Sequence, residues 1–100
     1  MRIKLQNVRG YMWELEFSQL SGEENLPRDY HALGAIGTER GRVSTVVREE
    51  AEAVFGRFHL FMQSSGRGTC AWEFLGEGDE NLILEASQRI AARLGVELEL

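Results

Sequence analysis

The chain contains very little cysteine, proline, histidine or lysine. Its 100 residues include one cysteine, one proline, two histidines and a single lysine, Lys4. One cysteine cannot build a disulfide framework, so we expect a reducing compartment. No apolar run approaches the roughly 20 residues of a membrane-spanning helix, and the charged, alternating start of the chain is unlike a secretory signal. These absences predict a cytoplasmic protein with no membrane partner.

The rest of the composition is typical of a folded globular domain. The chain is 43% hydrophobic and 27% charged, which is far from the composition of disordered segments. A chain of 100 residues can bury one hydrophobic core without disulfide bonds or metal ions, but it is too short to form two domains. We therefore predict one domain over residues 1–100. The net charge of −5 argues against a general nucleic-acid binder, whose affinity comes from neutralising phosphates.

Two alternating stretches at the amino terminus predict a β-hairpin. With residues 8–10 as its loop, Leu5 faces Trp13 on one side of the hairpin and Lys4 faces Glu14 on the other. A slip by one residue would set apolar side chains against charged ones, so the pattern resists it. The hairpin predicts a sheet with one buried face and one solvated face.

A second hairpin is predicted further along the chain. Residues 58–63 and 69–75 flank a turn at 64–68 that is rich in serine and glycine. Pairing Gln63 with Thr69 places the large apolar residues on the inner face. Three side chains on the outer face then need an explanation, namely those of His59, Glu73 and Phe61. His59 lies opposite Glu73, and Phe61 lies opposite Ala71.

Helical spacing predicts two main helices. The first runs from about residue 45 to 55 and ends near Gly56, and the second runs from Asp79 to Leu94 and ends at Gly95. For residues 44–58 a strand stays open as the alternative, because Val43, Thr45 and Val47 also alternate. The buried stripe of the second helix comprises Ile83, Ala86, Ile90 and Leu94. Residues 96–100 alternate as a final strand.

Residues 21–43 form a long insertion of weak structural signal. A short helix is predicted to begin at Asn25, and residues 34–42 read as an irregular connection containing three glycines. A long connection in a small domain needs a reason, and binding residues concentrate on such loops. The polar residues that we expect to bind here are Arg28, Asp29, His31, Arg40 and Arg42.

The elements together predict an α+β fold. From Tyr11 the order is strand, helix, strand, strand, helix, strand, which is the split βαβ (ferredoxin-like) order with residues 2–8 as an extra amino-terminal strand. The sheet would be antiparallel, with both helices packed on one face. An unrelated α+β meander with the same elements fits equally well, because the 21–43 insertion counts against the ferredoxin-like order.

No catalytic or metal-binding cluster is visible in the sequence. The two histidines do not have metal-ligand spacing with Cys70, and we expect no cofactor or metal. Cys70 falls on the inner face of its strand, where a small buried thiol is the simplest interpretation. His59 opposite Glu73 could act in acid–base chemistry, but no nucleophile accompanies the pair. We therefore expect binding and not catalysis.

These observations predict a small cytoplasmic protein-interaction or regulatory module that contacts a protein partner through the 21–43 segment and the exposed sheet face. In size and charge alone, the chain is similar to small inhibitor and immunity-type proteins of bacteria and phage. If the apolar residues of the outer face are contiguous, a homodimer could also form there. The expected binding residues are Arg28, Asp29, His31, Arg40, Arg42, His59, Phe61 and Glu73.

Two other functions stay open. One is a small-molecule or anion site in which His31 or His59 does acid–base work. The other is nucleic-acid binding through Arg40, Arg42, Arg57 and Arg67. The predicted register disfavours RNA stacking on the sheet, because it places most aromatic residues inside: Trp13, Phe17, Phe58, Trp72 and Phe74.

Overall fold

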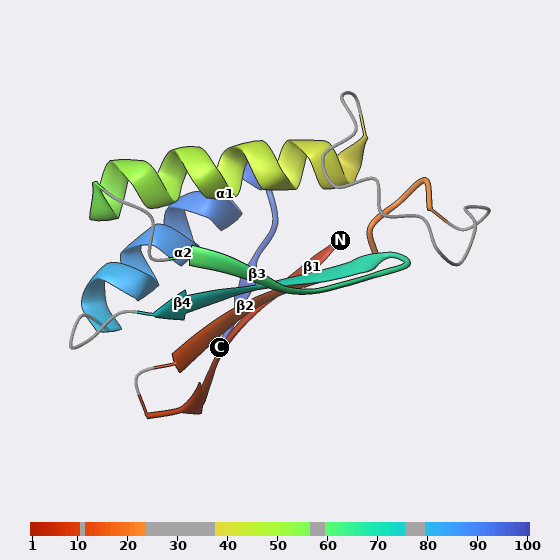
Figure 1. Cartoon of the computed structure of the whole chain (residues 1–100). Helices are drawn as coiled ribbons and strands as arrows, with labels where there is room; N and C mark the ends of the chain where they lie inside the picture. Colours follow the sequence, from red (N-terminus) through yellow and green to blue (C-terminus); the bar gives the residue numbers. More distant parts are fainter. Residues whose placement is uncertain (11, 24–37, 57–59, 76–79) are drawn as a thin grey trace.

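The computed structural model describes residues 1–10, 12–23, 38–56, 60–75 and 80–100, with the backbone alone for 60–65 and 75. It contains five strands and two helices (Figure 1). In chain order these are β1 (Arg2–Arg9), β2 (Met12–Ser18), α1 (Glu39–Phe55), β3 (Leu60–Gly66), β4 (Thr69–Leu75), α2 (Glu80–Leu94) and β5 (Leu98–Glu99). The α+β class is therefore confirmed.

The five strands form one mixed sheet in the order β3-β4-β2-β1-β5. All neighbours are antiparallel except β1 and β5, which run parallel. The expectation of a purely antiparallel sheet is therefore wrong at this edge. The ferredoxin-like order is also not reproduced, because β1 lies between β2 and β5. The physical reason is local: β1 reaches the free edge of β2 through a short turn, so β5 is left to pair with β1.

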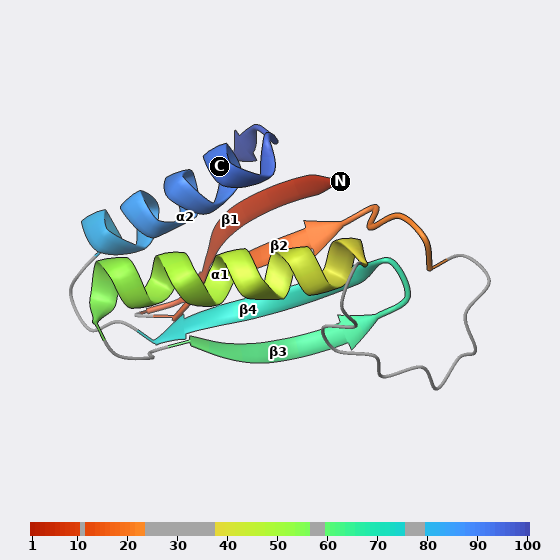
Figure 2. The same cartoon turned by 90° about the horizontal axis from the view of Figure 1, so that it is seen from above.

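Both helices lie on the same face of the sheet, as expected, and run side by side over it (Figures 1 and 2). The core lies between this helical layer and the inner face of the sheet. Phe17, Trp72 and Phe74 all point inward and are at most 5% exposed, and Trp13 is half-buried. Placing these aromatic residues inside is confirmed, whereas Phe58 lies outside the described residues.

The first hairpin keeps its predicted faces but not its predicted pairing. Leu5 pairs with Leu15, and Lys4 pairs with Glu16, a displacement of two residues from the expected register. The cause is that β1 continues to Arg9 through an irregularity between Asn7 and Arg9, so the turn comes later than expected. A displacement of two residues preserves side-chain alternation, so the inner face stays apolar.

The second hairpin has a tighter turn than expected. Gly66 pairs with Thr69, so only two residues connect β3 to β4, and Gly68 takes a positive φ of 72° that glycine adopts without a steric penalty. A register shift between Met62 and Ser64 then changes the rest of the pairing.

As a result, the three predicted pairs of the second hairpin are wrong, including Gln63 with Thr69. Phe61 lies opposite Glu73, in the position expected for His59, and Ser64 lies opposite Ala71, in the position expected for Phe61. The tight turn displaces β3 along β4 by three residues next to the turn, and the bulge reduces this displacement to two residues in the first half of the strand. His59 itself lies outside the described residues.

The first helix begins earlier than the sequence predicts. The Gly41 N–H donates to Thr38 Oγ1 (3.0 Å), which caps the helix and allows it to start at Glu39. Residues 39–42, expected to be irregular, are therefore helical. The helix ends at Phe55, and Gly56 closes it with a φ of 75°. The short helix expected from Asn25 lies outside the described residues.

The second helix matches its prediction closely. It spans Glu80 to Leu94, its predicted stripe is buried, and Gly95 has a φ of 69°. The cap expected at Asp79 lies outside the described residues. The final strand is shorter than expected, because only Leu98 and Glu99 pair with β1. Neither described helix is long and apolar enough to cross a membrane.

One buried hydroxyl in α2 predicts a stabilising substitution. Ser87 is fully buried, and its Oγ has no hydrogen-bond partner. Removing an unsatisfied buried hydroxyl recovers its desolvation penalty, so we expect Ser87→Ala to raise the free energy of unfolding by about 1 kcal/mol. Urea denaturation measures this. Ser44→Ala is the control. Ser44 is also buried in a helix, but its hydroxyl oxygen is not among the buried atoms that lack a partner. An equal gain in unfolding free energy in both variants would contradict the explanation.

Candidate functional site

The residues that the sequence singled out for binding do not come together in one place. Four of them lie outside the described residues: Arg28, Asp29, His31 and His59. Arg40 and Arg42 belong to the first turns of α1, whereas Phe61 and Glu73 pair across β3 and β4. The described residues therefore divide into a helix-start cluster and a sheet-face cluster.

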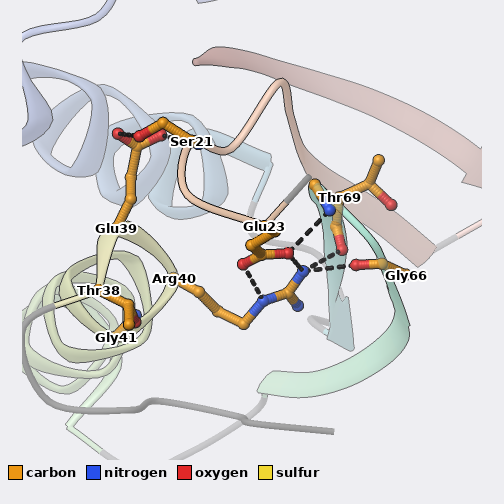
Figure 3. A network of polar contacts seen from close by, with 9 residues as sticks. Ser21, Glu23, Thr38, Glu39, Arg40, Gly41, Gly66 and Thr69 are labelled. Atoms are coloured by element: carbon orange, nitrogen blue, oxygen red, sulfur yellow. Dashed lines mark hydrogen bonds and ion pairs between the residues drawn. The ribbon is translucent and has the colours of Figure 1, made fainter. Parts of the chain in front are cut away.

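Arg40 forms a buried ion pair with Glu23. Its Nε donates to Glu23 Oε2 (2.8 Å) and its Nη2 donates to Glu23 Oε1 (2.7 Å), and the two residues are 3% and 6% exposed (Figure 3). We expected Arg40 on an irregular connection, ready to meet an anionic ligand. That expectation is wrong, because the guanidinium is enclosed and its charge is already neutralised by a carboxylate of the same chain.

The same two side chains also hold the β3–β4 turn. Arg40 Nη2 donates to the carbonyl oxygens of Gly66 (2.5 Å) and Thr69 (2.9 Å), and the Gly68 N–H donates to Glu23 Oε1 (2.8 Å). The Leu20 N–H completes the set by donating to the Gly68 carbonyl (2.9 Å). We call these contacts the Arg40–Glu23 clasp. It joins the segment after β2, the start of α1 and the β3–β4 turn.

The clasp depends on where α1 begins. Because Thr38 caps the helix, Arg40 falls in its first turn and points toward the β3–β4 turn (Figure 3). Glu39 points to the segment after β2, where it accepts from the Ser21 N–H (3.2 Å) and the Ser21 hydroxyl (2.8 Å). Adjacent residues of one helical turn thus hold two different segments in place.

The electrostatics of the clasp favour an ionised Glu23. Hydrogen bonding to Arg40 lowers the pKa of the Glu23 carboxyl below its usual value of 4.5, and the Gly68 N–H and the Arg40 charge act in the same direction. Burial acts against them. Since a guanidinium stays protonated at all ordinary pH values, the pair is charged at neutral pH.

Arg42 is exposed but serves the contact between the helices. Its Nη2 donates to the carbonyl oxygen of Arg93 (3.1 Å), in the last turn of α2, where a cation also complements the helix dipole. Nearby, Glu50 accepts from Arg89 (2.7 Å) and Arg93 (3.5 Å). The arginines expected to contact nucleic acid are thus largely committed within the chain. Arg67 also has a partner, and Arg57 lies outside the described residues.

The face of the sheet opposite α1 and α2 carries no described helix (Figure 1). We call it the outer face. Cross-strand pairing arranges its residues in two adjacent rows. One row contains Lys4, Glu16, Ala71 and Ser64, and the other contains Gln6, Glu14, Glu73 and Phe61. The sequence placed Glu73 on this face, and the pairing agrees.

Glu73 is a residue of low exposure on a sheet face that no described helix covers, and its carboxylate oxygens are not among the enclosed unpaired atoms of the described residues. It is only 8% exposed and lies directly opposite Glu14 on β2. Gln6 Nε2 donates to Glu14 Oε1 (3.0 Å), but none of the described side chains forms a hydrogen bond or ion pair with Glu73. Like charges directly opposite each other destabilise a sheet. This carboxylate pair is the strongest candidate site in the described part of the chain.

The described residues provide little for catalysis. They contain no group of three or more histidine, cysteine, aspartate or glutamate residues that could hold a metal ion. Burial raises the pKa of the Cys70 thiol to about 11, with the nearby Arg40 charge opposing it. Cys70 is therefore protonated at neutral pH, as expected for a buried structural cysteine.

Sequence reasoning missed Glu14 and Glu23 as important residues. Glu14 could be placed on the outer face from alternation, but its position beside Glu73 follows only from the pairing of β2 with β4. Glu23 gave no local signal, because its partner Arg40 lies 17 residues away in a different element.

The clasp predicts a large loss of stability when one partner is neutralised. Glu23→Gln leaves the Arg40 guanidinium buried without a counter-charge, so we expect a loss of about 3 kcal/mol in the free energy of unfolding at pH 7. Urea denaturation measures it. Glu99→Gln is the control: it breaks the exposed pair with Arg2, and exposed pairs contribute little. Equal losses in the two variants would contradict the clasp's importance.

The clasp also predicts a specific pH dependence. Because the folded-state pKa of Glu23 is lowered, its stabilising contribution is complete above the unfolded pKa of about 4.3 and is lost as the pH falls through the folded value. We expect the difference in unfolding free energy between the wild type and Glu23→Gln to shrink from pH 7 to pH 3. Urea midpoints across this range test it, and a constant difference would show that the carboxylate charge is unimportant.

Comparisons with known proteins supply no function for either cluster. No family model, no curated protein and no solved structure matches the chain. Of the two clusters, the helix-start cluster is engaged in contacts within the chain, whereas the outer face carries no described helix.

Proposed function

We propose that the protein is a small interaction module that binds a basic protein partner through the outer face of its sheet. The observation that carries this proposal is the acidic centre of that face, where Glu14 and Glu73 lie opposite each other on neighbouring strands. Carboxylates at the centre of an uncovered sheet cost stability, so their presence needs a reason outside the fold.

The distribution of charge on the outer face supports a basic partner. Toward the β1–β5 edge, positive and negative charges balance, because Arg2 pairs with Glu99 (2.6 Å) and Lys4 lies opposite Glu16. At the centre, Glu14 receives only a neutral amide, and Glu73 receives nothing from the described residues. The net charge of −5 would add long-range attraction for a positive surface.

The segment between β2 and α1 contributes less to the proposed partner contact than the sequence indicated. At its described ends, Glu23, Glu39 and Arg40 are all engaged in contacts within the chain. We therefore move the centre of the proposed contact from the 21–43 segment to the outer face. A regulatory or inhibitor-type role for the module remains part of this proposal, and it would follow from the partner's own activity.

A homodimer through the same face is a weaker proposal. In a symmetric dimer each patch meets its own copy, so a dimer centred on Glu14 and Glu73 would bring carboxylates against carboxylates. A partner of opposite charge avoids this repulsion.

Affinity capture from the source cell tests the proposed function. The double variant Glu14→Lys, Glu16→Lys reverses charge on the outer face, and Glu52→Lys, Glu85→Lys makes the same change at exposed positions of α1 and α2. We expect the wild type and the helix-layer variant to retain the same partner and the outer-face variant to lose it. Thermal melts must show that both variants fold.

Two results would contradict the proposal. One is the capture of no partner by the wild type at low ionic strength, where charge attraction is strongest. The other is loss of the partner in the helix-layer variant with retention in the outer-face variant, which would move the contact to the helices.

A further inference from the structure

We draw no further inference here: the strongest candidate, the edge of β3 (Leu60–Gly66) that no described strand covers, is interrupted by a bulge between Met62 and Ser64, and nothing in the described part of the chain shows what would pair with it.

Discussion

The buried ion pair between Arg40 and Glu23 is the interaction on which the arrangement of the chain most depends. It connects three segments that are far apart in the sequence, namely the turn after β2, the first turn of α1 and the β3–β4 turn. A buried ion pair is seldom worth more than a well-packed apolar replacement. Its importance here lies in the positions that it fixes. The Arg40 guanidinium finds its hydrogen-bond acceptors only if α1 begins at Glu39 and the β3–β4 turn lies at residues 66–69. One side chain therefore fixes the start of the helix and the position of the turn.

Side-chain alternation and helical spacing were enough to predict the layers of the fold. Both hairpins have the predicted inner faces, and α2 has its predicted limits and buried stripe. The exact pairing was not accessible, because the irregular turns and bulges shift it by two residues in the first hairpin and by two to three residues in the second. Strand order was equally hidden, since nothing local in β1 or β5 indicates that they pair in parallel.

For the candidate site too, the sequence predicted which face a residue lies on but not which residues are its neighbours. Alternation placed Glu73 on the outer face, but its neighbours Glu14 and Phe61 depend on strand order and on the bulge in β3. Arg40 and Arg42 were misassigned because glycines around them obscured the helix start that Thr38 caps. The residues that serve the fold and those left on the outer face could be separated only once their partners were known.

The position of β1 between β2 and β5 has a consequence for how the chain folds. β1 and β2 are close in sequence and can pair early. The other edge of β1 pairs only with residues 98 and 99, which are separated from it by nearly the whole sequence. Closing so long a loop is slow because its entropy is lost before the contact forms. Until then β1 exposes an unpaired edge, the usual starting point of strand-to-strand aggregation. Arg2 and Lys4 lie on that strand, and charged side chains on an edge strand oppose pairing with another chain.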